Sequence, residues 1–315
     1  MNFYDPPKVV AFGGGHGLSA SLSALRRLTP QLTAVVTVAD DGGSSGRLRR
    51  EFDCLPPGDL RMALAALCGD DDTGRRWAQV LQARFTGDGA LSGHAIGNLL
   101  IAGLWQQLED PVAALDMVAE LLKTRGRVLP MSSVPLTIEA DVIGLDPLAP
   151  DELRTLSGQA TVASTRATVQ SVRLVPDQPP ARPEAVQAIR EADALVLGPG
   201  SWFTSVIPHL LVPDLARAFT ESDASKVLVL NIAPAAETHG FSASRHIELL
   251  AEHAAFLRLG HVIADEGFAS NDPYLESYVQ SLGGELVVAD VAARDGTPRH
   301  DPLRLASTFS EVLGL

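Results

Sequence analysis

Three short glycine-rich segments carry most of the groups in this sequence that can do chemistry. The first, residues 13–20, reads GGGHGLSA, and its spacing Gly15-x-Gly17-x-x-Ala20 matches the looser fingerprint of dinucleotide-binding loops. Successive glycines let backbone N–H groups converge without Cβ clashes, and a following helix offers its positive end to a phosphate. We therefore predict a phosphate site here, with a tight turn that binds nothing as the alternative. The predicted contacts are Gly14, Gly15, His16 and Gly17.

The second segment, residues 40–47, reads DDGGSSGR. Two adjacent carboxylates can accept ribose hydroxyls or hold a divalent cation such as Mg²⁺ through oxygen ligands. The glycine and serine run supplies further donors, and an arginine can grip a phosphate as a fork. A conventional dehydrogenase has one acid here, so the second acid favours a larger polar ligand, whereas an Asp-Gly turn that caps a helix is the alternative. The predicted contacts are Asp40, Asp41, Gly43, Ser44, Ser45 and Arg47.

The third segment, residues 198–205, reads GPGSWFTS and follows the apolar run ALVL. It repeats the order of strand, glycine loop and helix in the second half of the chain. Its hydroxyls can bind an anion or cap the next helix. The predicted contacts are Gly198, Gly200, Ser201, Thr204 and Ser205.

Polar pairs elsewhere extend these predictions. Asp59 and Arg61 lie at a predicted helix start. We predict that Asp59 faces a ligand or a metal and that Arg61 neutralises phosphate. The alternative is that Asp59 acts only as an N-cap. His94 and Asn98 lie four residues apart on one helical face and can orient a sugar or base, with a histidine satisfied inside the core as the alternative.

Further polar residues follow the run KVLVL, and several chemistries lack their motif. Asn231 ends that run, and Glu237 and Thr238 lie in the loop beyond it, so we include all three among the ligand contacts. The sequence has no H-E-x-x-H or paired C-x-x-C for zinc and no P-loop. Any chemistry therefore depends on carboxylates, Mg²⁺ and positioning, and no residue is assigned a catalytic role.

Short apolar runs must position these loops. Residues 8–12, 33–39, 194–198, 226–231 and 261–264 read as buried strands, with helical spacing between them. Such alternation predicts parallel pairing with right-handed crossovers. The fold class is therefore α/β, a Rossmann-like, doubly wound and mostly parallel sheet. Ligands of such sheets bind beyond the carboxyl ends of the strands, at a topological switch point.

The middle of the chain changes character twice. Residues 47–125 repeat apolar positions at helical spacing and predict four helices, at 60–68, 75–84, 96–108 and 111–123. Residues 127–175 are rich in valine and threonine, and alternation over 160–175 favours strands. We predict one domain, 1–315, with a helical insertion at about 47–125, and two domains as the alternative.

Composition limits the partners. The chain has 315 residues, of which 46% are hydrophobic, and a formal charge of −13. This balance supplies a core and argues against binding to nucleic acid or anionic membranes. The two cysteines, the lack of a leader and the lack of a membrane-spanning apolar run predict a cytoplasmic protein without membrane insertion.

The motifs together resemble those of a known family. GGGHGLS, VADDGGSSGRLRRE, LPPGDLR, SGHAIGNLL, LGPGSWFTSVIP and NIAP…ETHGFS occur here in the order seen in the YvcK/CofD-like family, over residues 8–305. The sequence is more similar to the YvcK branch, the gluconeogenesis factors, than to the 2-phospho-L-lactate transferases. The resemblance implies a sugar-nucleotide ligand, with UDP-GlcNAc favoured, and a role in cell shape or in cell-wall and carbon metabolism.

The transferase branch implies a second set of roles. Its members use Mg²⁺ and a nucleotide-activated acid, and its acidic metal positions correspond to Asp40, Asp41 and Asp59. Arg299 matches a basic position near the family's C-terminal end that reaches the ligand's phosphates.

Three functional hypotheses follow. The leading one is a non-catalytic regulatory protein that senses a UDP-sugar. The alternative is a Mg²⁺-dependent transferase of the 2-phospho-L-lactate type, and the third is an NAD(P)-dependent oxidoreductase, supported by the first loop alone. A homodimer through the inserted helices, and cell-wall or signalling proteins as partners, stay open.

Overall fold

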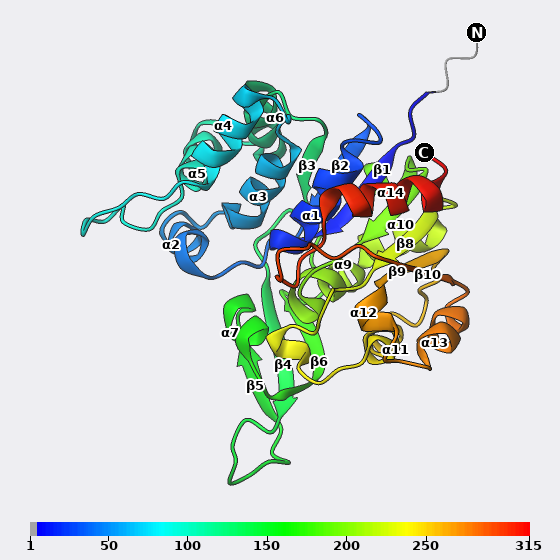
Figure 1. The fold of residues 1–315 in the computed structure, drawn as a ribbon. Helices are drawn as coiled ribbons and strands as arrows, with labels where there is room; N and C mark the ends of the chain where they lie inside the picture. The colour runs from blue at the N-terminus through cyan, green and yellow to red at the C-terminus, as the bar shows by residue number, and fades with distance from the viewer. Residues whose placement is uncertain (1–4) are drawn as a thin grey trace.

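A seven-stranded parallel sheet forms the centre of the molecule (Figure 1). The computed structural model describes residues 5–315. The strand order is β10-β9-β8-β7-β1-β2-β3, and every neighbouring pair is parallel. The strands are β1 (Val9–Gly13), β2 (Leu32–Val36), β3 (Arg127–Pro130), β7 (Ala194–Leu197), β8 (Ser225–Val229), β9 (His261–Asp265) and β10 (Glu285–Ala289).

The strand order reverses between β1 and β7. From β1 the chain moves outward through β2 to β3, and it later returns to pair β7 with the other side of β1. Every residue of β1 and β7 is buried, which is why both read as unbroken apolar runs. This reversal is a topological switch point, where ligands of open α/β sheets bind.

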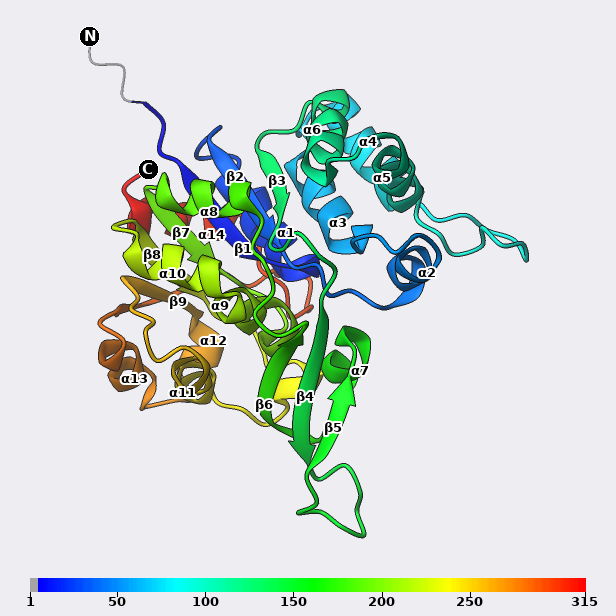
Figure 2. The same cartoon turned by 180° about the vertical axis from the view of Figure 1, so that it is seen from behind.

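Helices cover both faces of the sheet. Figure 1 shows α1 (Gly15–Leu25) and α14 (Pro302–Leu313) on one face, and Figure 2 shows α8 (Pro183–Arg190), α9 (Ile207–Leu211) and α10 (Pro213–Glu221) on the other. Three more helices lie near β8 to β10. They are α11 (Ala243–His253), α12 (Glu266–Ala269) and α13 (Leu275–Ser281). The predicted doubly wound, mostly parallel α/β fold is confirmed.

Five consecutive helices separate β2 from β3. They are α2 (Gly43–Phe52), α3 (Pro57–Leu67), α4 (Asp72–Gln82), α5 (Ile96–Gln107) and α6 (Pro111–Leu122). The four predicted helices correspond to α3–α6. We did not predict α2, since its start, GSSGR, combines residues of low helix propensity, and tertiary contacts override that preference.

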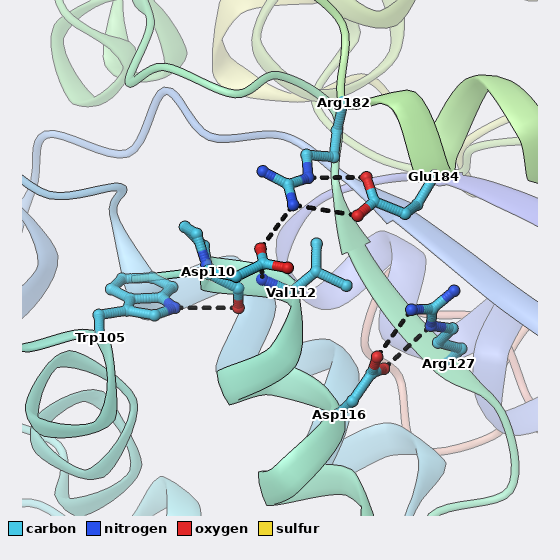
Figure 3. A network of polar contacts seen from close by, with 8 residues as sticks. Trp105, Asp110, Val112, Asp116, Arg127, Arg182 and Glu184 are labelled. Atoms are coloured by element: carbon cyan, nitrogen blue, oxygen red, sulfur yellow. Dashed lines mark hydrogen bonds and ion pairs between the residues drawn. The ribbon is translucent and has the colours of Figure 1, made fainter. Parts of the chain in front are cut away.

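Ion pairs join the inserted helices to the sheet (Figure 3). Asp116 of α6 accepts hydrogen bonds of 2.9 and 2.7 Å from the guanidinium of Arg127 at the start of β3. Arg182 contacts both Asp110, the N-cap of α6, and Glu184 at the start of α8. These pairs orient α6 against the sheet edge.

A second, smaller sheet lies beside the first. It is antiparallel, in the order β5-β4-β6, and consists of β4 (Thr137–Ile143), β5 (Arg154–Ser157) and β6 (Thr168–Val175). The strand-like pattern predicted over 160–175 was wrong for its first part, because Gln159–Ser164 form helix α7. A carboxylate from a distant loop caps that helix, and such a contact cannot be read from local alternation.

No helix within residues 5–315 is both long enough and apolar enough to cross a bilayer.

Candidate functional site

The first glycine loop lies between the other two predicted loops. A Cβ at Gly14 would lie 2.5 Å from Cγ2 of Thr37 and 2.6 Å from Oδ2 of Asp59, and a Cβ at Gly17 would lie 2.2 Å from the carbonyl oxygen of Pro199. Only glycine permits these approaches. The first turn of α1, residues 15–18, contains no acidic residue. Its backbone amides therefore present positive potential at the edge of the sheet where the strands β1, β2 and β7 have their carboxyl ends.

The two adjacent acids of the second loop diverge. Oδ1 of Asp40 accepts a 3.0 Å hydrogen bond from the amide of Gly42, and its Oδ2 would lie 2.5 Å from a Cβ at Gly58, at the start of α3. Oδ1 of Asp41 instead accepts a 3.0 Å hydrogen bond from the amide of Ala160, in the first turn of α7. Asp41 is therefore committed to a helix terminus.

Asp59 is a buried carboxyl group near the first two loops. It is 9% exposed, and its Oδ2 has no hydrogen-bond partner among residues 5–315. Burial raises the pKa of Asp59 to about 7, and the negative charge of Asp40 adds to the effect, while hydrogen bonds from Gln159 and Gly15 and the charge of Arg61 oppose it. Asp40 and Asp59 thus form a carboxylate pair near the N-terminal turn of α1.

The predicted metal set Asp40, Asp41 and Asp59 does not gather as one group. Within the described part of the chain, no three His, Cys, Asp or Glu side chains are arranged to hold a metal ion. Asp40 and Asp59 retain the oxygen chemistry that Mg²⁺ prefers, and the unpartnered Oδ2 of Asp59 fits such a role. These two residues are the metal ligands that the geometry still allows.

The serines of the second loop point into the inserted helices. The Oγ of Ser44 lies 2.9 Å from Nδ1 of His94 and accepts a 3.0 Å hydrogen bond from Nδ2 of Asn98. Asn98 also donates to Ser45 over 3.4 Å and accepts a 2.8 Å bond from Nε of Arg61. All five side chains are buried. They join α2, α3 and α5 through hydrogen bonds, which is a structural role that the sequence did not separate from ligand binding.

Arg47 has a similar structural contact. Its Nη2 donates a 2.7 Å hydrogen bond to the carbonyl oxygen of Ser92, in the loop that links α4 to α5.

The last predicted residue of the second loop, Gly43, lies at the start of α2 and is exposed.

The third loop is held by Asn231 and Glu237. Asn231, directly after β8, both accepts from the amide of Gly200 and donates to its carbonyl oxygen, each over 2.9 Å. Oε1 of Glu237 accepts a 2.6 Å bond from Oγ of Ser201 and a 3.2 Å bond from the amide of Phe203. Both residues therefore set the loop's shape.

Burial raises the pKa of Glu237, whereas the hydrogen bonds from Ser201, Phe203 and Trp202 oppose this rise.

Other predicted residues of this region also make internal contacts. Thr204 donates to Ser201 over 2.5 Å, and Thr238 accepts from the amide of Ala235 over 3.0 Å.

Two more predicted residues complete this loop. The carbonyl oxygen of Gly198 accepts a 2.7 Å bond from Oγ of Ser21 on α1. The carbonyl oxygen of Ser205 lies 2.9 Å from Nδ1 of His209. These contacts join the loop to the helices on both faces of the sheet.

A cavity of about 430 Å³ opens between the first and third loops. His16 lines it from α1, Gly200 and Asn231 from the third loop and the end of β8, and Arg299 from the C-terminal segment. Sequence reasoning missed Ser19, Ser23 and His300, which also line it. Ser19 and Ser23 follow His16 at helical spacing. This spacing could have been used to predict that the three residues lie on one face of the helix.

His300 is a neutral side chain in this wall. Burial lowers its pKa to about 4, opposed by a backbone hydrogen bond at Leu230 and by the charge of Asp265.

Comparison with known proteins shows the family of this chain. Residues 9–299 match the family model described as 2-phospho-L-lactate transferase CofD. The chain belongs to the CofD family. A putative gluconeogenesis factor of Mycobacterium tuberculosis is 55% identical over 308 residues, which cover 96% of this chain and 90% of the relative. The gluconeogenesis factor of Listeria monocytogenes is 40% identical over 98% of this chain and 96% of its own.

A solved structure of this group has the same fold. The crystal structure of a UPF0052 family member from Bacillus halodurans covers 96% of this chain and 98% of its own, with a TM-score of 0.83 and 32% sequence identity. The CofD family match ends at Arg299, so it includes the three loops and the last charged residue of the cavity.

Not every cavity of this CofD family member lies at the switch point. One of about 510 Å³ lies at the amino edge of β1 and β2. Its wall includes Lys8 and Glu191, which pair with each other over 3.1 Å. With those charges neutralised and the glycine loops at the opposite edge, we assign no ligand to it.

Proposed function

We propose that this protein binds a nucleotide sugar, with UDP-GlcNAc the favoured candidate, and acts as a regulatory protein of the gluconeogenesis-factor type. One observation carries the proposal. A cavity of about 430 Å³ adjoins the N-terminus of α1 where two glycine loops meet. The diphosphate would lie on the amides of residues 15–17, and the exposed Arg299 would neutralise it.

The cavity walls suit the rest of such a ligand. Ile232, Ala233 and Pro234 supply apolar surface, while His16 and the amide of Asn231 supply polar groups. Small-molecule sites combine these two features. The uridine and sugar would divide this space between them.

The cellular role in this proposal comes from the relatives. Their name, gluconeogenesis factor, supports a link to carbon metabolism, and we extend it to cell-wall metabolism and cell shape. We place the protein in the cytoplasm, where thiols stay reduced, because Cys54 and Cys68 are both free. A homodimer through the inserted helices stays a prediction, and Met117 and Leu121 on α6 are exposed there.

A ligand panel tests the proposal. UDP-GlcNAc, UDP-glucose, GDP, NAD and NADP are compared by thermal shift and calorimetry, each with and without Mg²⁺. A ligand at 100 times its Kd stabilises the fold by roughly 2.7 kcal/mol. We expect UDP-sugars to bind and Arg299→Gln to weaken them about tenfold, whereas Arg294→Gln, an equal charge change in the same exposed segment, leaves affinity unchanged. Binding of NAD(P) alone, or of no nucleotide, would refute the proposal.

The carboxylate pair supports a second candidate, a Mg²⁺-dependent transferase of the 2-phospho-L-lactate type. Asp40 and Asp59 would hold the ion, which would neutralise phosphate charge when bound. The amides of α1 would orient the phosphates, and Asp59 would release its proton as the ion binds. Turnover of a nucleotide-activated phospholactate that needs Mg²⁺ and is lost in Asp40→Asn would favour this function. Ligand binding without turnover would leave the regulatory protein.

A further inference from the structure

A second cavity lies beside the first along α1. It measures about 530 Å³ and is bounded by α1, α3 and α4. Three residues, His16, Ser19 and Ser23, line both this cavity and the one described above. They form one stripe along α1, so the two cavities open on the same helix face and share a border.

Two arginines give the second cavity its charge. Arg61 and Arg84 both line it, and neither forms an ion pair with any of residues 5–315. Their hydrogen bonds go to neutral groups instead, such as Asn98 for Arg61 and the carbonyl oxygen of Gly93 for Arg84. By contrast, Arg127 and Arg182 in Figure 3 are both paired with carboxylates.

This charge is unusual for the molecule. The chain carries a net charge of −13, so two neighbouring guanidinium groups without an ion-pair partner among residues 5–315 stand against its overall charge. Arg61 is only 5% exposed. Burial lowers the pKa of Arg61 to about 10, and the nearby charge of Arg84 adds to this, while the charges of Asp59 and Asp40 oppose it. A bound anion would relieve both the repulsion and part of the desolvation.

The remaining walls fit a small organic anion. Ala65, Ala66 and Ala78 leave room through their short side chains, and Met62 adds adaptable apolar surface. Gln82 also lines the cavity, and its Oε1 is the acceptor for Arg61, which directs its amide group to be a donor. Donors on one side and small apolar residues on the other suit a compact body with one charged end.

We propose that this cavity is a second ligand site, which takes the carboxylate or phosphate end of a small metabolite beside the nucleotide site. The shared stripe on α1 lets the two ligands occupy neighbouring positions. The site depends on the arginines and the cavity, and it goes beyond the nucleotide-binding function, since it does not require that the first cavity hold a UDP-sugar.

The experiment measures anion binding by two probes, inorganic phosphate and malonate. Each is titrated by calorimetry into the full-length protein, alone and with an excess of UDP, the probe for the glycine loops. Arg84→Gln is expected to weaken the bound anion about tenfold, in keeping with a lost charge-assisted hydrogen bond. Arg76→Gln, an equal charge change on the exposed side of α4, is the matched control and should change affinity less than twofold.

A second variant guards against an indirect effect of charge. Ser23→Ala removes a hydroxyl group from the α1 wall of the cavity. It leaves the charge unchanged and does not lower the helix propensity. We expect it to weaken anion binding about threefold. Preference for phosphate or for malonate identifies the type of anionic end. Equal anion affinity in wild type and Arg84→Gln, or equal losses in Arg84→Gln and Arg76→Gln, would overturn the proposal.

The same data separate this site from the nucleotide function. If UDP does not bind but phosphate binding depends on Arg84, the nucleotide proposal fails and the second site stands. If UDP binds equally to wild type and Arg84→Gln while neither probe anion binds, the second site fails and the nucleotide proposal stands.

Discussion

The loops after β2 and β7 look alike in sequence but differ in what their polar side chains do. Both combine glycine with hydroxyl residues, and both flank β1 at the switch point. Ser44 and Ser45, after β2, are buried in a hydrogen-bond network that joins the inserted helices. Ser201, after β7, is half-buried and is held by Glu237 beside a cavity. A polar loop at a strand end can therefore either join structural elements or border a cavity.

The largest expected effect tests Asp59, which lies beside Gly14 of the first loop and near Asp40. Its folded-state pKa of about 7 exceeds the ordinary value of 3.8, so the folded protein binds this proton more tightly than the unfolded chain. The stability that this proton contributes is therefore fully present below pH 4 and is lost as the pH rises through about 7. Three pKa units correspond to about 4 kcal/mol. Urea unfolding from pH 4 to pH 8 should show this loss in the wild type and not in Asp59→Asn.

Asp72→Asn, at the exposed start of α4, is the control and should follow the wild type. A wild-type profile that Asp59→Asn reproduces would show that Asp59 does not carry the proton.

The network behind the β2 loop gives the next largest effect. Asn98→Ala removes one acceptor of the buried Arg61 and the donor to Ser44. We expect a loss of about 3 kcal/mol in the free energy of unfolding, because a buried charged group loses one of its hydrogen-bond partners and Ser44 loses its donor. Affinity for UDP-GlcNAc should change less than twofold in the folded protein. Asn271→Ala, a change of an exposed residue, is the control. A tenfold loss of nucleotide affinity in Asn98→Ala would contradict the purely structural role that we assign to the polar side chains of the β2 loop.

The β7 loop should show the opposite pattern. Glu237→Ala leaves the hydroxyl of Ser201 and the amide of Phe203 without their acceptor, at a cost of about 2 kcal/mol. Here nucleotide affinity should fall together with stability, because the loop borders the cavity. Glu237→Gln keeps an acceptor oxygen and should restore more than half of the affinity. Full affinity in Glu237→Ala would contradict a positioning role.

The smallest effect concerns Asp41. Asp41→Ala removes the carboxylate that accepts from Ala160 at the start of α7, and loss of such a cap costs about 1 kcal/mol. Thermal unfolding measures this change. Mg²⁺ affinity should stay as in the wild type, while Asp40→Asn should lower it, and the reverse order would restore Asp41 as a metal ligand.

Sequence reasoning found the elements better than the roles of their residues. The strands of the main sheet that we predicted are present within a few residues, because buried parallel strands read as apolar runs. The period of 3.6 residues likewise located α3–α6. It failed at α2 and α7, whose glycine and serine content or alternation favours other structures, and in which contacts with distant residues stabilise the helix.

By itself, the sequence determined the fold class and the location of the glycine loops, since hydrophobic periodicity and strand-end glycines are local properties. Only the tertiary structure decided which polar residues face a cavity. Adjacent acids such as Asp40 and Asp41 point to different helices, and Arg61 and Arg84 come together although 23 positions separate them in the chain. Direction and burial depend on the packing of distant segments, and no short-range pattern records that packing.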